Sequence, residues 1–242
     1  VFSESSWVTG VVQFLYKRAL SRSSRVFFQN EDDRGLFVSS GLVSVGITDR
    51  LPGSGVDLDK FVPQALPNGE RVRFLLVARM LWDKGIAEFV QAARLLRQRG
   101  VQAEFCLLGL LDVQNPSAIS RRQMDEWIAE GVINYLGVSD NVRDVISTAD
   151  CVVLPSFYRE GVPRTLLEAT AMSRPIVTTD SVGCREVVDH GVNGYLCKPK
   201  DAIDLAEKLE KIIDLGPSGR TQMGMLSRKK VEQEFDEQIV ID

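Results

Sequence analysis

The sequence predicts an α/β protein with a doubly wound parallel sheet, and two observations indicate this fold. From about residue 66 onward, short apolar runs alternate with segments of helical pattern, as expected when each strand is followed by a helix that crosses the sheet. The apolar runs are nearly continuous rather than alternating, as in strands covered on both faces. This pattern favours a Rossmann-like sheet with strand order 3-2-1-4-5-6, whose ligand crevice opens beyond its first and fourth strands.

The expected elements follow one another as strand and helix pairs. The strands are expected at 72–77, 103–108, 133–136, 151–154, 175–179 and 194–197. The helices that follow them are expected at 86–99, 120–130, 142–148, 163–172, 184–189 and 202–215. A last helix, rich in Arg, Lys and Glu, is expected at about 220–235 after a break at 216–220.

The first 65 residues lack this alternation. They predict a helix at 6–20, a strand at 25–29 and a second helix at 32–39. The first helix combines apolar and basic residues: Trp7, Val8, Val11, Val12, Phe14, Leu15 and Tyr16, with Lys17, Arg18, Arg22 and Arg25 nearby. Such a helix can pack inside a lobe or lie on an anionic membrane surface, and both interpretations stay open.

Composition narrows the class of protein. A chain of 242 residues with 44% hydrophobic content can form one large domain or two small ones. The formal net charge of −4 argues against general nucleic-acid binding. The cysteines form no C-x-x-C pair, so we expect buried thiols in a reducing compartment: Cys106, Cys151, Cys184 and Cys197. No apolar run approaches the roughly 18 residues that cross a bilayer, and no signal peptide is visible.

Two glutamates eight positions apart, Glu160 and Glu168, flank the start of a helix that opens at Pro163. The free N–H groups and positive dipole end of such a helix can hold a phosphate. Glu168 lies about five residues into the helix, roughly 7 Å along its axis. A carboxylate on each side of an anion site suits a long ligand with hydroxyl-rich ends, such as a nucleotide sugar. A surface loop followed by an amphipathic helix has the same spacing.

The expected topology joins this motif to a second one. Arg79 and Lys84 lie in the loop after the first strand of the sheet, and Glu160 lies in the loop after the fourth. In the order 3-2-1-4-5-6 these two strands are neighbours, so both loops meet at the ligand crevice. This convergence favours a nucleotide-sugar site over a surface loop.

Several segments together resemble the family-four retaining glycosyltransferases, which have the two-lobed GT-B fold. Residues 157–169 resemble the E-x7-E signature of that family, and 77–85 resemble its Arg…Lys-Gly phosphate loop. Residues 53–57 with Phe61 are similar to its interlobe linker. Gly109, Asp112, 115–119 and 183–188 are typical of the bacterial branch that extends lipid-linked or capsular polysaccharide sugars. The resemblance covers about residues 1–215.

The resemblance implies a division of the chain. Residues 1–50 would be a remnant of the N-terminal acceptor lobe, and 51–65 the interlobe linker. Residues 66–215 would form the nucleotide-sugar-binding lobe, and 216–242 a terminal helix that crosses back.

The resemblance also implies roles for the motif residues. Arg79 and Lys84 would bind the donor diphosphate, Glu168 the ribose hydroxyls, and Glu160 the donor sugar. There Glu160 would orient the sugar or stabilise positive charge at the anomeric carbon. Three further residues would bring the backbone close to the donor: Gly161, Val162 and Pro163.

The implied function is transfer of a sugar, with retention, from a UDP-sugar to a lipid-linked or polysaccharide acceptor. No metal or other cofactor is expected, because Asp57-Leu58-Asp59 is interpreted as a turn or helix cap. His190 is interpreted as a helix end. The resembled family usually has a catalytic or substrate-contacting histidine in its N-terminal lobe, and this chain has no match for it. We therefore expect these 242 residues alone to be inactive. The alternatives are a GT-B nucleotide-sugar epimerase and a donor-binding module without catalysis. The expected location is cytoplasmic, with peripheral contact at the inner membrane face through the basic helix.

Overall fold

A computed structural model describes residues 7–241. The chain forms two compact units, divided between Gly53 and Ser54. This boundary lies inside the segment 51–65 that the resemblance gives as a linker, and the roles assigned to the segments remain predictions.

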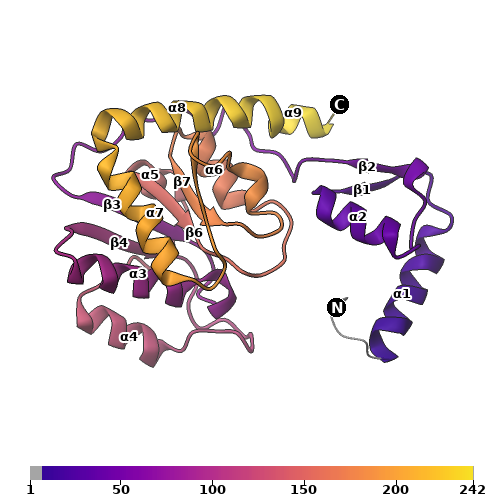
Figure 1. The fold of residues 1–242 in the computed structure, drawn as a ribbon, viewed down its shortest axis with the longest axis horizontal. Coiled ribbons are helices and arrows are strands. Elements are labelled where there is room, and N and C mark those ends of the chain that lie inside the picture. Colours follow the sequence, from indigo (N-terminus) through magenta and orange to yellow (C-terminus); the bar gives the residue numbers. More distant parts are fainter. Residues whose placement is uncertain (1–6, 242) are drawn as a thin grey trace. The chain divides into compact units, whose positions relative to one another are not determined.

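The larger unit is built on a six-stranded parallel sheet with the order β5-β4-β3-β6-β7-β8 (Figure 1). Its strands are β3 (Val72–Val77), β4 (Ala103–Leu108), β5 (Asn134–Tyr135), β6 (Cys151–Leu154), β7 (Ile176–Thr179) and β8 (Gly194–Cys197). Counted from β3, this is the predicted order 3-2-1-4-5-6, so the doubly wound fold is confirmed. The central strand β3 pairs with β4 on one side and with β6 on the other.

The core lies on both faces of the sheet, because successive side chains of a strand point to opposite faces. Phe74 and Leu76 belong to one buried cluster, whereas Leu75 between them belongs to the other. Each such side chain contributes roughly 1.5–3 kcal/mol when fully buried. The continuous apolar runs of the sequence therefore reflect two covered faces.

Helices on the two faces complete these clusters. The cluster of Phe74 includes residues of α3 (Ile86–Gln98), α4 (Arg121–Glu130) and α7 (Ala202–Asp214). The cluster of Leu75 includes residues of α5 (Val142–Ser147), α6 (Arg164–Ala171) and α8 (Gly216–Glu234). Local signals set helix ends: the Ser120 side chain accepts a hydrogen bond from the Gln123 N–H, and Gly131 ends α4 at a φ of 72°.

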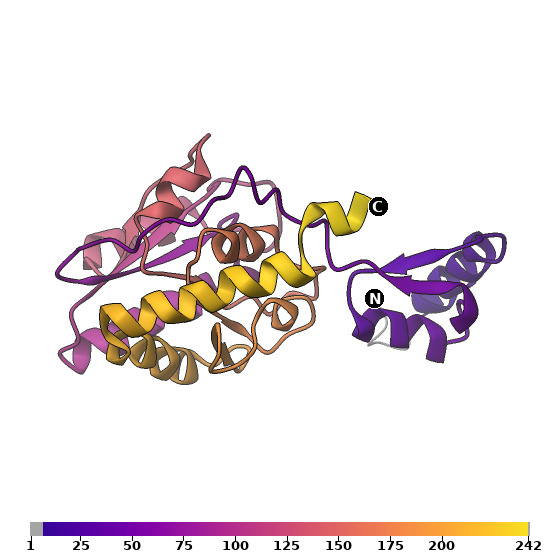
Figure 2. The same ribbon diagram turned by 90° about the horizontal axis from the view of Figure 1, so that it is seen from above.

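The last long helix begins earlier than the sequence predicted. We expected a start near residue 220, but α8 begins at Gly216, and Pro217 occupies its first turn, where no amide donor is required. Figure 2 shows α8 as the long yellow helix lying along the larger unit. Arg228 Nη1 donates to the carbonyls of Phe61 (2.8 Å) and Ala171 (2.9 Å), which fixes α8 against α6 and the segment before β3. A short helix, α9 (Glu237–Ile241), follows.

The helix predicted at 184–189 is wrong, because only a three-residue 3₁₀ turn forms there, Arg185–Val187. Asn193 explains the difference: its side chain accepts from the Asp189 N–H at 2.7 Å and donates to the Val187 carbonyl at 2.9 Å. These bonds turn the chain toward β8. His190 therefore ends no helix; its Nδ1 accepts a hydrogen bond from the Leu196 N–H at 3.0 Å.

The smaller unit contains α1 (Trp7–Leu20), β1 (Val26–Phe28), α2 (Glu31–Ser39), a 3₁₀ turn (Val45–Ile47) and β2 (Thr48–Arg50). Residue 6 of the expected first helix lies outside the described residues. Strand β2, which the sequence did not predict, pairs in parallel with β1. Across residues 7–241, no helix combines the length and the apolar character needed to cross a membrane.

Candidate functional site

Two loops meet at the carboxyl edge of the sheet, as the topology predicted. The loop after β3 contains the 3₁₀ turn η2 (Trp82–Lys84), and its Asp83 carbonyl accepts a hydrogen bond from the Phe157 N–H of the loop after β6 at 3.0 Å. Gly85 has a φ of 76°, and a Cβ there would lie 2.1 Å from the Pro155 carbonyl oxygen. The two loops can approach this closely because residue 85 is glycine.

The contact between these loops joins Lys84 to Glu160. Lys84 Nζ lies 2.6 Å from Glu160 Oε2, and the two side chains are only 15% and 20% exposed. The other carboxylate oxygen, Oε1, accepts a hydrogen bond from Ser156 Oγ at 3.0 Å. A lysine ammonium has three donors, so Lys84 can hold Glu160 and still meet a phosphate oxygen. The pair therefore places a shielded carboxylate beside an available cation.

A third loop, which follows β7, packs against the Glu160 segment. Gly183 has a φ of 84°, and a Cβ there would lie 2.2 Å from the Gly161 carbonyl oxygen and 2.4 Å from that of Glu160. The hydroxyls of Thr179 and Ser181 both donate to the Ser156 carbonyl, that of Ser181 at 3.1 Å. The Glu160 loop is thus held on one side by the loop after β3 and on the other by the end of β7 and the loop after it.

Helix α6 begins directly after this loop. Gly161 is half-buried and Val162 and Pro163 are buried, and Pro163 precedes the first helical residue, Arg164. The N-terminal turn of α6 contains no acidic residue, so its positive end is not neutralised from within the helix. This leaves the start of α6 suited to an anion.

Glu168 lies further along α6, where its side chain is 14% exposed and pairs with Arg164 Nε at 3.2 Å. Burial raises the pKa of Glu168, and the positive charges of Arg164 and Lys60 offset part of that effect. Arg164 itself is 64% exposed and pairs with Glu168. Among residues 7–241, Glu168 is therefore a shielded carboxylate whose hydrogen-bonding partner is Arg164.

Arg79 lies in the same loop as Lys84, with an exposed side chain. Among residues 7–241 its guanidinium makes no hydrogen bond or ion pair. Tyr158, also at this edge, is 54% exposed, and its ring centroid lies 5.8 Å from Lys84 Nζ. The structure thus brings Lys84 and Glu160 into contact, whereas Arg79 and Glu168 lie on the adjoining loop and helix.

Sequence reasoning missed three residues that support the site, namely Ser156, Thr179 and Ser181, and it gave Gly183 only as part of the resemblance at 183–188, without a structural role. Ser156 directly follows Pro155 at the end of a strand, where small polar residues are common in loops. The only available signal was its place four residues before Glu160 at the end of the fourth strand of the sheet.

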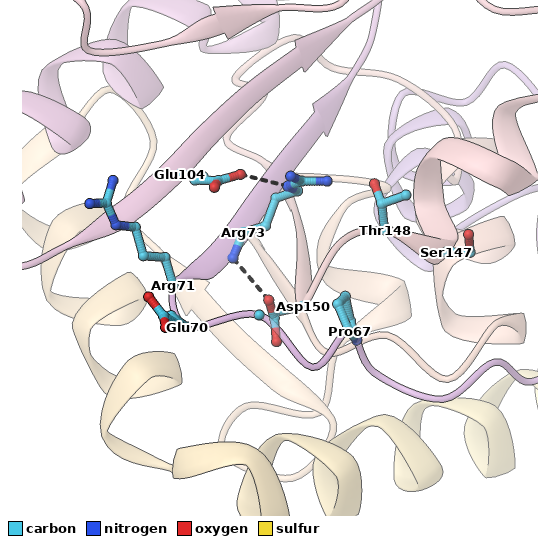
Figure 3. A pocket seen from close by; sticks show the side chains of 9 residues that line it. Pro67, Glu70, Arg71, Arg73, Glu104, Ser147, Thr148 and Asp150 are labelled. Atoms are coloured by element: carbon cyan, nitrogen blue, oxygen red, sulfur yellow. Dashed lines mark hydrogen bonds and ion pairs between the residues drawn. The ribbon is translucent and has the colours of Figure 1, made fainter.

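A cavity of about 630 Å³ lies at the opposite, amino-terminal edge of the sheet (Figure 3). Its lining residues are Pro67, Gly69, Glu70, Arg71, Arg73, Glu104, Ser147, Thr148 and Asp150. Arg73 Nε pairs with Glu104 Oε2 at 2.7 Å, and the Arg73 N–H donates to Asp150 Oδ2 at 2.9 Å, so these groups satisfy one another. Because doubly wound sheets bind ligands at their carboxyl edge, we place the candidate site at the Lys84–Glu160 loops instead.

The residues considered for a metal have structural roles. Asp57 Oδ1 accepts hydrogen bonds from the N–H groups of Asp59 (3.0 Å) and Lys60 (2.7 Å), which is the turn predicted from the sequence. All four cysteines are buried free thiols, as predicted, and burial raises the pKa of Cys197 to about 12. Within the described ranges, no group of three or more His, Cys, Asp or Glu side chains is arranged to hold a metal ion.

A six-stranded doubly wound sheet with charged loops at its carboxyl edge has the architecture of one GT-B glycosyltransferase lobe, and solved structures agree. A glycosyltransferase from Rickettsia africae ESF-5 superposes with a TM-score of 0.83 at 17% identity, over 96% of this chain and 64% of that one. A sucrose-phosphate synthase from Thermosynechococcus elongatus gives 0.81 at 25% identity, over 100% and 62%. Anabaena Alr3699/HepE in complex with UDP gives 0.80 at 20% identity, over 95% and 65%.

Residues 71–214 match the family described as glycosyl transferases group 1, and the chain belongs to this family. It is 31% identical over 223 residues to the N,N'-diacetylbacillosaminyl-diphospho-undecaprenol alpha-1,3-N-acetylgalactosaminyltransferase of Campylobacter jejuni, covering 87% of this chain and 57% of that protein. It is 28% identical over 194 residues to the putative colanic acid biosynthesis glycosyltransferase WcaL of Escherichia coli, covering 77% and 47%. The chain thus spans about half the length of these relatives.

Proposed function

We propose that this chain forms the donor-binding part of a bacterial retaining glycosyltransferase, which transfers a sugar from a UDP-sugar to a lipid-linked or polysaccharide acceptor. The observation that carries the proposal is the 2.6 Å contact of Lys84 with Glu160 at the carboxyl edge of the sheet. The relatives support the kind of acceptor, because one is named for a diphospho-undecaprenol acceptor and another for colanic acid biosynthesis.

The chemistry of sugar transfer gives each group a role. As the glycosidic bond breaks, the leaving nucleoside diphosphate gains negative charge, which the spare donors of Lys84, the guanidinium of Arg79 and the start of α6 offset. Positive charge develops at the anomeric carbon, and in this proposal the Glu160 carboxylate stabilises that charge or orients the sugar. Glu168 in its ionised form accepts hydrogen bonds from the ribose hydroxyls. Metal-free binding follows from these side-chain cations and remains a prediction.

We also propose that these 242 residues bind the donor without transferring its sugar, because the relatives named as transferases are about twice as long as the matched part. Correct positioning of an acceptor can account for about 7–11 kcal/mol of a barrier. The remaining length of such an enzyme would supply that positioning.

A donor screen tests the proposal. The thermal stability of the chain is measured with UDP-, GDP- and ADP-sugars, and only UDP-sugars are expected to raise the melting temperature. The complete enzyme is then incubated with the selected donor and a polyprenyl-diphosphate-sugar, and the products are analysed. Transferred sugar supports the proposal, an epimerised nucleotide sugar would identify the epimerase alternative, and an unchanged donor would identify a binding module.

Helix α1 supports a proposal about location. Trp7 and Phe14 are 82% and 67% exposed, and Lys17, Arg18 and Arg22 follow at its carboxyl end and just beyond. We propose that this helix contacts the anionic cytoplasmic face of a membrane, where aromatic side chains enter the interface and basic ones meet lipid phosphates. Co-sedimentation with phosphatidylglycerol vesicles tests this. Replacing Trp7 and Phe14 by Ser should abolish binding, whereas Ile203→Ser, at a 59% exposed position on α7, should leave it intact.

A further inference from the structure

Ser156 is fully buried between the three loops of the candidate site and has no role in the function proposed so far. Its Oγ lies 3.0 Å from Glu160 Oε1 and 3.2 Å from the Asp83 carbonyl oxygen. Its own carbonyl oxygen accepts hydrogen bonds from Thr179 and Ser181. These hydrogen bonds hold the Ser156 backbone in place, and its hydroxyl lies against the Glu160 carboxylate.

The single hydroxyl proton of Ser156 has one preferred acceptor. The Asp83 carbonyl already accepts the Phe157 N–H at 3.0 Å, whereas Glu160 Oε1 offers a shorter, charge-assisted hydrogen bond. Hydrogen bonds to ionised acceptors are roughly twice as strong as neutral ones. The Ser156 proton is accordingly directed at Glu160.

The two partners of Glu160 differ in what they can do when a donor binds. Lys84 is a cation whose remaining donors would meet the diphosphate in the proposed function, and its hydrogen bond to Glu160 Oε2 would weaken as it shares its charge with phosphate oxygens. Ser156 is neutral and fully buried, so a diphosphate at the surface of the site would leave its hydrogen bond to Oε1 unchanged. We propose that Ser156 is a positioning residue that keeps the Glu160 carboxylate oriented toward the donor sugar while Lys84 engages the diphosphate. This inference rests on the proposed function, in which Glu160 acts at the sugar.

The test is a double-mutant cycle in the complete enzyme, with the UDP-sugar varied up to saturation so that both kcat and the KM for the donor are measured. Ser156→Ala should lower kcat by about 10- to 100-fold, the size expected for one lost hydrogen bond to a charged group. The KM for the donor should change by less than about threefold, because a group oriented for the transition state affects the rate more than donor binding. In the Glu160→Gln background, Ser156→Ala should cost less than about twofold more, because its acceptor charge is already gone.

Two further variants keep the test decisive. Ser227→Ala is the matched control, because Ser227 is also fully buried and donates one hydrogen bond to a backbone carbonyl, that of Asn193 at 2.9 Å, but does not touch Glu160. It should leave kcat unchanged. If Ser156→Ala fails to fold, Ser156→Cys, which has the same shape and is slightly larger but donates only weakly, should show a similar loss of kcat.

The possible results distinguish a wrong role for Glu160 from a wrong role for Ser156. If Glu160→Gln keeps full kcat, the role of Glu160 in the proposed function is wrong and the inference falls with it. If Glu160→Gln lowers kcat but Ser156→Ala keeps full kcat, the inference alone is overturned. An equal loss from Ser156→Ala in both backgrounds would also overturn it, because the serine would then act independently of the carboxylate.

Discussion

At the scale of single residues, Lys84 connects the two halves of the candidate site. Its ammonium contacts Glu160 from the neighbouring loop. The family resemblance had implied separate roles, with Lys84 binding the diphosphate and Glu160 the donor sugar. The contact is mostly shielded from solvent, where an ion pair interacts more strongly than at a surface. One lysine can thus hold the carboxylate and remain available to an anion.

Lys84→Ala should weaken binding of UDP by about 10- to 100-fold, because a charge-assisted hydrogen bond is worth about 1.5–3 kcal/mol. Binding of uridine, which carries no phosphate, should be unchanged. Isothermal calorimetry with both ligands measures the difference. Lys211→Ala, at an exposed lysine on α7, serves as the control and should affect neither ligand. Equal losses for uridine and UDP would show that Lys84 does not bind phosphate.

At the scale of elements, the site depends on close backbone contacts between three loops. Gly85 lets the loop after β3 meet the loop after β6, and Gly183 lets the loop after β7 meet the Glu160–Gly161 peptide. Helix α6 then starts at the end of this assembly and adds its positive end. The positions of the functional side chains therefore depend on the close backbone approaches at Gly85 and Gly183.

Gly183→Ala should displace the Glu160–Gly161 peptide. Alanine at this positive φ costs about 1–2 kcal/mol of backbone strain, and the clash should add about 1–3 kcal/mol. The matched control is Gly191→Ala, because Gly191 has a φ of 80° but nothing within 4 Å of its Cβ position. Urea unfolding should show a larger loss of stability for Gly183→Ala, and calorimetry should show weaker UDP-sugar binding for this variant alone. Equal effects of the two substitutions would contradict the support attributed to the loop after β7.

Helix α6 carries Glu168 at an energetic cost. Burial raises the pKa of this carboxyl in the folded chain, so its contribution to stability is present at low pH and is lost as the pH rises through the folded-state pKa. Glu168→Gln should therefore raise the melting temperature at pH 8, and the gain should vanish below about pH 4, where the carboxyl is protonated in both states. The same variant should bind UDP-sugar more weakly.

The control for this pH dependence is Glu207→Gln, because Glu207 is exposed on α7. Its melting temperature should differ from that of the native chain by the same small amount at both pH values. A lower melting temperature for Glu168→Gln at pH 8 would show that the Arg164 pair outweighs the cost of burial.

At the scale of the whole molecule, the topology was predictable because the central strands β3, β4, β6 and β7 are largely buried on both faces. The runs at 72–77, 103–108, 151–154 and 194–197 match β3, β4, β6 and β8 residue for residue. The prediction fails in segments whose secondary structure depends on tertiary contacts. The side chain of Asn193 replaces the helix expected at 184–189 by a turn, and β2 exists only through its pairing with β1.

The candidate site was predictable at the level of which loops meet, but not of which atoms touch. Strand order alone placed the Lys84 and Glu160 loops side by side. The direct Lys84–Glu160 pair, the Ser156 hydrogen bond and the approach of Gly183 depend on loop conformations that no local pattern encodes. Residues that support a site are small or polar and have no periodicity, so a sequence does not distinguish them from other loop residues.

The central claim is that the side chains at the carboxyl edge hold a nucleoside diphosphate without a metal ion, and thermal unfolding of the 242-residue chain in EDTA with UDP tests it most directly. At about 100 times its dissociation constant, UDP should add roughly 2.7 kcal/mol to the free energy of unfolding. The stabilisation should be the same with or without added manganese, and at the same UDP concentration it should fall to about 0.4–1.4 kcal/mol in Lys84→Ala, as a 10- to 100-fold weaker affinity requires. No stabilisation in EDTA, with full stabilisation once manganese is added, would contradict the account.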